Sequence, residues 1–227
     1  MANLKHAIKQ GIVALKAKNI QPVMQTVGDE CLLKGKTALV VGGSGGIGKA
    51  VAKAFLKNGA NVVIAGTRRA KVDKVVLELG EKCAGVVVDL AEPETFSKVI
   101  DEAVAFYGPI DILVNSAGVH TEDVSMGGFL DFSVEEYDRI LDINLRGVYF
   151  MVQSVAKRMI SDKVSNGHIL IVSSSAGNEP AWSPYRVSKW GLKGITEAWL
   201  PPRSSWHCSQ RDCARQHGDS SSWRRGG

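Results

Sequence analysis

Short apolar runs alternate with longer amphipathic segments along most of the chain. The runs predict five strands, at Thr37–Val41, Asn61–Ala65, Ala84–Val88, Ile112–Asn115 and His168–Val172. The segments between them carry apolar residues at helical spacing and predict helices at Gly48–Asn58, Ala70–Leu79, Pro93–Phe106 and Val134 to Lys157. Strands that are apolar throughout are buried on both faces, as in a parallel sheet covered by helices. The pattern therefore predicts an α/β fold, a doubly wound parallel sheet with helices on both faces.

The two ends of the chain depart from this alternation. Apolar residues recur at helical spacing from Leu4 to Leu15, which predicts a short amphipathic helix in an N-terminal extension, residues 1–33. Residues 34–200 are predicted to form the α/β domain. Because Arg203–Gly227 contains no Leu, Ile, Val or Lys, it offers nothing for a buried strand, and residues 201–227 are predicted to form an irregular tail.

Composition limits the classes of protein to which the chain can belong. With 227 residues, 44% of them hydrophobic, it suits one domain with a sizeable core. The net charge of +5 comes largely from tail arginines, so the body is near neutral and no nucleic-acid partner is predicted. There is no membrane-spanning run, signal-peptide core or secreted cysteine framework, which predicts a cytoplasmic protein without a membrane partner. The tail's His and Cys residues lack hydrophobic context, so no metal site is predicted.

A glycine-rich turn joins the first predicted strand to the helix that follows. Gly42, Gly46 and Gly48 have the spacing G-x3-G-x-G, and Ser44 and Ile47 lie between them. The missing side chains let the backbone turn tightly and approach a pyrophosphate on the helix N-terminus. Because the turn lies between a buried strand and an amphipathic helix, it predicts a dinucleotide-binding site.

A second motif, Y-x3-K, lies near the end of the predicted domain. Ser183 can cap a helix and Pro184 suits its first position, so Tyr185 enters in the first turn and Lys189 lies on the same face. A nearby ammonium favours the phenolate form, which lets a tyrosine exchange a proton near neutral pH. The pair therefore predicts a general acid and base, Tyr185.

In combination, these motifs resemble the short-chain dehydrogenase/reductase family, whose glycine turn has the same spacing. The resemblance extends from about Leu33 to Leu200 and implies a Rossmann-like fold. The family usually has threonine where this chain has Val41, a departure that concerns local rigidity more than chemistry. The segment Asn115 to Gly118 matches the family's N-N-A-G. Further cofactor contacts implied by the resemblance are Asp89, Leu90, Asn115, Ala117, Gly118, Tyr185 and Lys189.

The resemblance also implies the remaining catalytic roles. Ser174, 11 residues before the tyrosine, matches the serine that hydrogen-bonds the substrate oxygen, with Ser173 and Ser175 as alternatives. Asn144 matches the asparagine that distorts its helix and helps a water relay protons to the lysine. Lys189 is also expected to bond the nicotinamide ribose.

The end of the second predicted strand bears on the choice of cofactor. An acidic residue there would bind the ribose 2′-hydroxyl and favour NAD, but this chain has Gly66, followed by Thr67, Arg68 and Arg69. A guanidinium suits a 2′-phosphate, so NADP is predicted, with NAD as the alternative. Gly45 lacks the basic side chain that many NADP-preferring relatives have in the glycine turn.

The resemblance stops after about residue 200, where relatives continue with a sixth and a seventh strand. Read one nucleotide later, permitted codons for Trp206–Arg215 give Gly-Ile-Val-Val-Asn-Gly-Ile-Ala-Pro-Gly, the missing family segment, which favours a frameshift. Without those strands, apolar faces are expected to be exposed on the His168–Val172 strand and on the helix that bears Trp190, Leu192 and Ile195.

These features predict an NAD(P)-dependent oxidoreductase acting on a secondary alcohol or ketone, a small molecule. The alternative is a catalytically silent, truncated member that binds nucleotide weakly or folds poorly. A methyltransferase of the same fold is disfavoured, because Tyr185, Lys189, Ser174 and Asn144 would then have no task. A homo-oligomer is expected for an intact relative but is not predicted for this chain.

Overall fold

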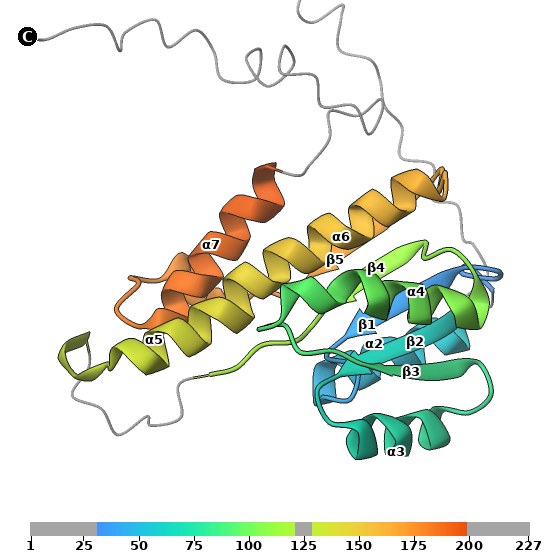
Figure 1. Cartoon of the computed structure of the whole chain (residues 1–227), viewed down its shortest axis with the longest axis horizontal. Helices are drawn as coiled ribbons and strands as arrows, with labels where there is room; N and C mark the ends of the chain where they lie inside the picture. The colour runs from blue at the N-terminus through green and yellow to red at the C-terminus, as the bar shows by residue number, and fades with distance from the viewer. Residues whose placement is uncertain (1–30, 121–128, 199–227) are drawn as a thin grey trace, which may run out of the picture.

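A parallel sheet forms the centre of the molecule. The computed structural model describes residues 31–120 and 129–198, within which five strands pair in the order β3-β2-β1-β4-β5 (Figure 1). The strands are β1 (Thr37–Val41), β2 (Asn61–Gly66), β3 (Cys83–Val87), β4 (Ile112–Asn115) and β5 (His168–Ile171). Every pair is parallel, and the register aligns Val41 with both Ala65 and Asn115. The predicted doubly wound sheet is thus confirmed, whereas the predicted N-terminal helix and the tail lie outside the described residues.

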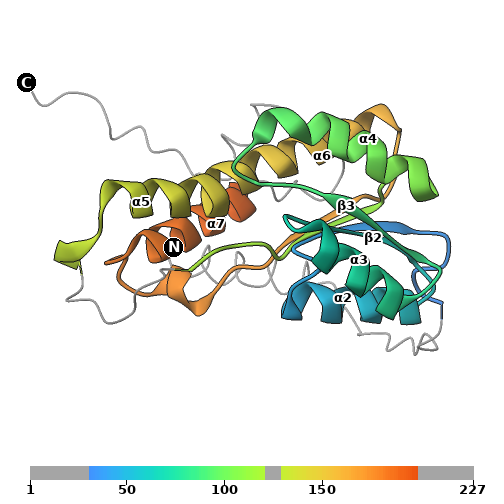
Figure 2. The same cartoon turned by 60° about the horizontal axis from the view of Figure 1, so that its bottom comes forward.

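Alternate residues of each strand point to opposite faces of the sheet. Both faces carry apolar side chains, and helices cover both of them. On one side lie α2 (Gly46–Lys57) and α3 (Arg69–Leu79), and on the other α4 (Phe96–Tyr107) and α6 (Val148–Ser161) (Figure 2). Leu39 and Val63 point into the core under α4 and α6, whereas Val40 and Ile64 point into the core over α2 and α3. All four strand side chains are fully buried, so the two cores hold the strand ends in fixed positions.

The segment predicted to be helical from Val134 to Lys157 consists of three parts. It runs through α5 (Val134–Leu141), a π-helical turn η3 (Asp142–Gly147) and α6. Gly147 ends the turn in close contact with the segment that follows β3, since a Cβ there would lie 2.1 Å from the carbonyl oxygen of Leu90. The segment is thus helical as predicted, and its π-helical turn contains Asn144, the residue that the resemblance implied would distort its helix.

The strand β5 lies at the edge of the described sheet and pairs with β4. Its residue Leu170 is 49% exposed, as expected for a strand whose outer face lacks cover. The helix α7 (Pro184–Ala198) behaves differently from the prediction: Leu192 is buried and Ile195 packs against the core under α6, although Trp190 is about half exposed. None of the helices within residues 31–120 and 129–198 is long and apolar enough to cross a membrane.

Candidate active site

The carboxyl ends of β1, β2, β3 and β4 open into one cleft. Its cavity has a volume of about 450 Å³ and lies between the glycine turn after β1 and the segment after β4. Seven of the predicted cofactor residues line it, namely Gly42, Ser44, Thr67, Asp89, Leu90, Ala117 and Gly118. Ligands of doubly wound sheets bind at this edge, where connections diverge to the two faces.

The glycine turn packs directly onto the end of β4. Gly42 has a φ of +79°, and a Cβ there would lie 2.6 Å from the backbone nitrogen of Ala117. A Cβ at Gly48 would lie 2.3 Å from the carbonyl oxygen of Gly42, so the first turn of α2 also needs a glycine. At Gly46 a Cβ would meet no heavy atom within 4 Å, because this residue faces open space. The first N–H groups of α2 are thus accessible to an anion, as in dinucleotide-binding turns.

The other seven predicted cofactor residues are not among the described residues that line the cleft: Gly46, Ile47, Gly48, Arg68, Asn115, Tyr185 and Lys189. Ile47 is 61% exposed at the start of α2, and Arg68 is exposed immediately before α3. Asn115 is fully buried at the end of β4, and neither atom of its side-chain amide has a hydrogen-bond partner in the described part of the chain. Its place in the sheet matches the prediction, but it does not reach the cavity.

At the end of β2 the structure brings a hydroxyl to the place where an acidic side chain was considered. A Cβ at Gly66 would lie 2.8 Å from the Ser44 Oγ, so these two residues are in close contact. Arg69, one of the arginines considered for the 2′-phosphate, forms an ion pair with Asp73 at 3.1 Å along the exposed face of α3. Lys71, which the sequence prediction omitted, lines the cleft instead.

The Y-x3-K pair lies at the start of α7, as predicted. The Ser183 Oγ accepts a hydrogen bond from the backbone nitrogen of Arg186 at 3.3 Å, and Pro184 is the first residue of the helix. The Lys189 Nζ lies 5.4 Å from the centroid of the Tyr185 ring. Lys189 is only 5% exposed, and this burial lowers the pKa of its ammonium.

The predicted Asn144 lies inside the π-helical turn and joins it to the end of β4. Its amide donates to the carbonyl oxygen of Val119 and accepts from the nitrogen of the same residue, both at 2.8 Å. It also donates to the Ser188 Oγ at 3.3 Å. A Cβ at Gly118 would lie 3.2 Å from the Asn144 Oδ1 and 3.7 Å from the Lys189 Nζ, so the three residues meet at one point.

The serine segment after β5 is held against α7. The Ser174 Oγ accepts from the backbone nitrogen of Ala176 at 3.2 Å, whereas Ser173 and Ser175 are exposed. Further along the segment, the Trp190 Nε1 donates to the carbonyl oxygen of Glu179 at 2.7 Å. These contacts fix the segment that carries Ser174 to the helix that carries the tyrosine.

The comparison with protein families agrees with this arrangement. The short chain dehydrogenase family model matches residues 36–202, which is more than half of the chain and includes the cleft and the Y-x3-K pair. The chain belongs to the short chain dehydrogenase family.

Curated members of this family match over nearly three quarters of the chain. Oxidoreductase UcpA of Escherichia coli (strain K12) is 36% identical over 172 residues, 73% of this chain and 63% of UcpA. The 3-oxoacyl-(acyl-carrier-protein) reductase FabG of Thermotoga maritima is 34% identical over 74% of this chain and 68% of its own length. Dehydrogenase/reductase SDR family member 4 of Homo sapiens is 35% identical over 73% of this chain and 59% of its own. This short chain dehydrogenase thus spans less than two thirds of the length of UcpA and of the human relative.

A solved structure of the same fold carries a nicotinamide nucleotide. An actinorhodin polyketide ketoreductase variant with NADPH superposes with a TM-score of 0.65 at 27% identity, covering 72% of this chain and 63% of that one. The likeness extends the family assignment from sequence to three-dimensional structure.

One residue beside Tyr185 was not predicted from the sequence. The His120 ring packs against the Tyr185 ring with centroids 4.2 Å apart and planes tilted by 41°. Its backbone carbonyl accepts from Arg139 at 3.2 Å, which helps to fix this end of the β4 segment. No motif marks His120, although its position two residues after Gly118 places it near the cleft.

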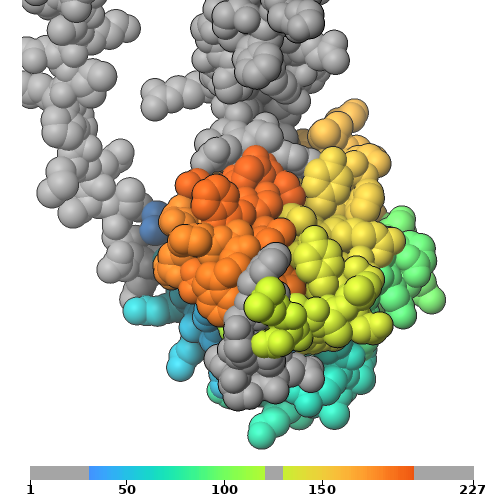
Figure 3. Space-filling model, turned by 90° about the vertical axis from the view of Figure 1, so that its left-hand side faces the viewer, coloured from blue at the N-terminus to red at the C-terminus, as the bar shows by residue number. Residues whose placement is uncertain are grey.

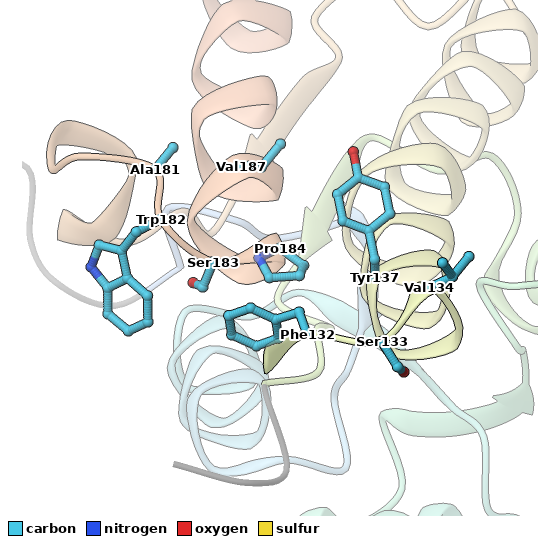
Figure 4. Close-up of a pocket in the computed structure, with 9 residues that line it drawn as sticks. All are labelled: Phe132, Ser133, Val134, Tyr137, Ala181, Trp182, Ser183, Pro184 and Val187. Atoms are coloured by element: carbon cyan, nitrogen blue, oxygen red, sulfur yellow. The ribbon is translucent and has the colours of Figure 1, made fainter. Parts of the chain in front are cut away.

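A second cavity, of about 300 Å³, lies between the start of α5 and the first turn of α7 (Figure 4). Figure 3 shows these two segments side by side on one face of the molecule. The residues that line it are mostly apolar: Phe132, Ser133, Val134, Tyr137, Ala181, Trp182, Ser183, Pro184 and Val187. The two cavities share none of the described lining residues.

Proposed function

We propose that this short chain dehydrogenase is an NADP-preferring oxidoreductase that interconverts a secondary alcohol and a ketone. The observation that carries the proposal is the Tyr185–Lys189 pair at the start of α7, with the Lys189 Nζ 5.4 Å from the tyrosine ring and close to Gly118 of the cleft. The NADPH-containing ketoreductase of the same fold supports the cofactor class.

The described residues fit a dinucleotide. The cleft of about 450 Å³ lies beside an accessible helix N-terminus, and the close packing of Gly42 and Gly48 leaves the backbone free of side chains there. Asp89 and Leu90 line the part assigned to the adenine ring, and Ala117 and Gly118 line the part towards the catalytic pair. When bound, the nicotinamide supplies or accepts the hydride.

Tyr185 moves the proton. It donates its phenolic proton to the carbonyl oxygen in reduction and recovers it from the hydroxyl in oxidation. The Lys189 ammonium favours the phenolate that forms in reduction. Because the Ser174 Oγ already accepts from the nitrogen of Ala176, its own O–H is available to hydrogen-bond the substrate oxygen.

Asn144 orders the site by a different route. Its two hydrogen bonds to Val119 fix the chain between Gly118 and His120, and its Oδ1 lies near the Lys189 Nζ. We assign it the role of holding the lysine and an associated water in place. The competing function is a nucleotide-binding protein without turnover, for which the exposed outer face of β5 is the supporting observation.

The test is the substitution Tyr185→Phe, which keeps the ring and removes the transferable proton. Carbonyl-dependent NADPH oxidation is measured with a panel of ketones, and nucleotide affinity is measured by fluorescence titration. Turnover is expected to fall by about 10²-fold or more with nucleotide affinity little changed. Tyr137→Phe, on α5 and outside the cleft, is the matched control. Nucleotide binding without turnover in the unsubstituted protein would favour the silent alternative, and near-normal turnover of Tyr185→Phe would assign the proton to another group.

A further inference from the structure

Three cations surround the end of β2, and they differ in their relation to the cleft. Arg68 is exposed before α3 and does not line the cavity. Arg69 forms its ion pair with Asp73 at 3.1 Å. Lys71, in the first turn of α3, lines the cavity together with Gly66 and Thr67. Among the described residues that line it, Lys71 is the one cation and Asp89 the one anion.

The surroundings of Lys71 suit an anion better than a ribose hydroxyl. The place where a carboxylate would bind a 2′-hydroxyl is occupied at Gly66 by the Ser44 Oγ, 2.8 Å from where a Cβ would lie. Ser44 and Thr67 thus bring two hydroxyl donors to the part of the cleft that Lys71 lines. Asp89 has its Oδ1 engaged by the nitrogen of Ala91 at 2.9 Å, which turns that oxygen towards the backbone after β3.

We infer that Lys71 is the residue that distinguishes NADP from NAD, by binding the 2′-phosphate with its ammonium while Ser44 and Thr67 donate hydrogen bonds. The inference rests on the proposed function, because it assigns a residue within the same nucleotide cleft. An ammonium on a flexible stem binds phosphate as a point charge and needs no fixed bidentate geometry. An exposed lysine at the rim of the cleft can therefore follow the phosphate as it enters.

The experiment measures dissociation constants for NADP, NAD, adenosine 2′,5′-bisphosphate and adenosine 5′-monophosphate by calorimetry. The variants are Lys71→Ala and Lys71→Arg, with Lys74→Ala as the matched control. Lys74 is an exposed lysine on the same helix and does not line the cleft. Arg68→Ala is measured in parallel to compare the arginine with the lysine.

Lys71→Ala is expected to weaken NADP and adenosine 2′,5′-bisphosphate by about 10- to 100-fold, the usual effect of losing one hydrogen bond to a charged group. Binding of NAD and adenosine 5′-monophosphate should stay unchanged, Lys71→Arg should retain most of the affinity, and Lys74→Ala should match the unsubstituted protein. The inference is overturned if Lys71→Ala behaves like Lys74→Ala, or if Arg68→Ala alone causes the selective loss. If the unsubstituted protein binds none of the four nucleotides, the proposed function itself fails.

Discussion

At the scale of single residues, the candidate site keeps a buried ammonium beside a tyrosine. Lys189 is 5% exposed, and its one described hydrogen bond is a long one, at 3.5 Å, to the carbonyl oxygen of Val172. Burial disfavours the charged form, which is why the pKa of Lys189 is lowered. Burying the charged ammonium of Lys189 lowers the free energy of unfolding. Such a loss of stability is common for groups that serve the activity of a protein.

This loss predicts how stability depends on pH. The lysine pKa is about 10.4 in an unfolded chain, and in the folded protein it is lower. Between these two pKa values the unfolded state binds more protons, so the contribution of Lys189 to the free energy of unfolding rises with pH. Lys189→Met should therefore be more stable than the unsubstituted protein at neutral pH, and the difference should shrink as the pH rises towards 10. Urea denaturation at several pH values measures it. A constant difference would show that methionine stabilises by packing alone.

At the scale of secondary-structure elements, Asn144 joins η3 to the segment that follows β4. Asn144 forms two hydrogen bonds of 2.8 Å with the backbone of Val119, as a strand partner would. Asn144 lies within the π-helical turn, and its side-chain amide bonds the backbone of the segment that follows β4. Such π turns often lie at functional sites.

Removing this connection should destabilise the domain. Asn144→Ala removes the partner of the Val119 N–H and C=O, and because Val119 is only partly buried the loss should lie near the lower end of the roughly 1–3 kcal/mol that an unpaired buried group costs. Asn58→Ala is the control, because that exposed amide makes one local bond, to the carbonyl oxygen of Ala54 at 2.9 Å. Denaturant unfolding of both variants gives the comparison. Equal and small losses would mean that water replaces the amide and that η3 does not depend on it.

How far the sequence alone could predict these elements depends on the signal that each one leaves. The strands are continuous apolar runs, so their positions were predicted to within one residue at either end. The π turn leaves no such signal in the apolar spacing, because one added residue shifts a helical pattern only slightly. Only the resemblance at Asn144 implied a distorted helix. The consequence of the turn, the contact of Asn144 with Val119, arises only when the turn is folded against the sheet.

The same reasoning explains which site residues were missed. Gly42 and Tyr185 belong to motifs with fixed spacing and could be identified directly. Lys71 and His120 have no motif, because α3 brings the first to the cleft and the segment after β4 brings the second to the tyrosine ring. The arginines next to Gly66 appeared better placed in sequence, yet Arg69 turns along its own helix to Asp73.

At the scale of the whole molecule, the parallel sheet is what makes a site out of distant segments. Its strands all end at one edge, so the turns after β1, β2, β3 and β4 converge on a single cleft although they come from distant parts of the chain. One hydrophobic core packs against each face of the sheet, and both cores contain buried residues of β1. Towards β5 the cover thins, and Leu170 is about half exposed. The strands that form the nucleotide cleft are therefore packed on both faces, whereas β5 is partly exposed.

This distribution predicts that nucleotide binding stabilises the entire domain. A ligand that binds the folded state alone adds about 2.7 kcal/mol to the free energy of unfolding when its concentration is 100 times its dissociation constant. The cleft joins segments from four strands, so local opening at any of them releases the nucleotide, and the stabilisation should appear in cooperative unfolding. Thermal unfolding is measured against increasing NADPH, with NADH at the same concentrations as the comparison. The midpoint should rise with the logarithm of NADPH concentration and rise less with NADH. A midpoint that stays constant up to millimolar NADPH would contradict binding in this cleft, and equal shifts with both nucleotides would contradict the preference for NADP.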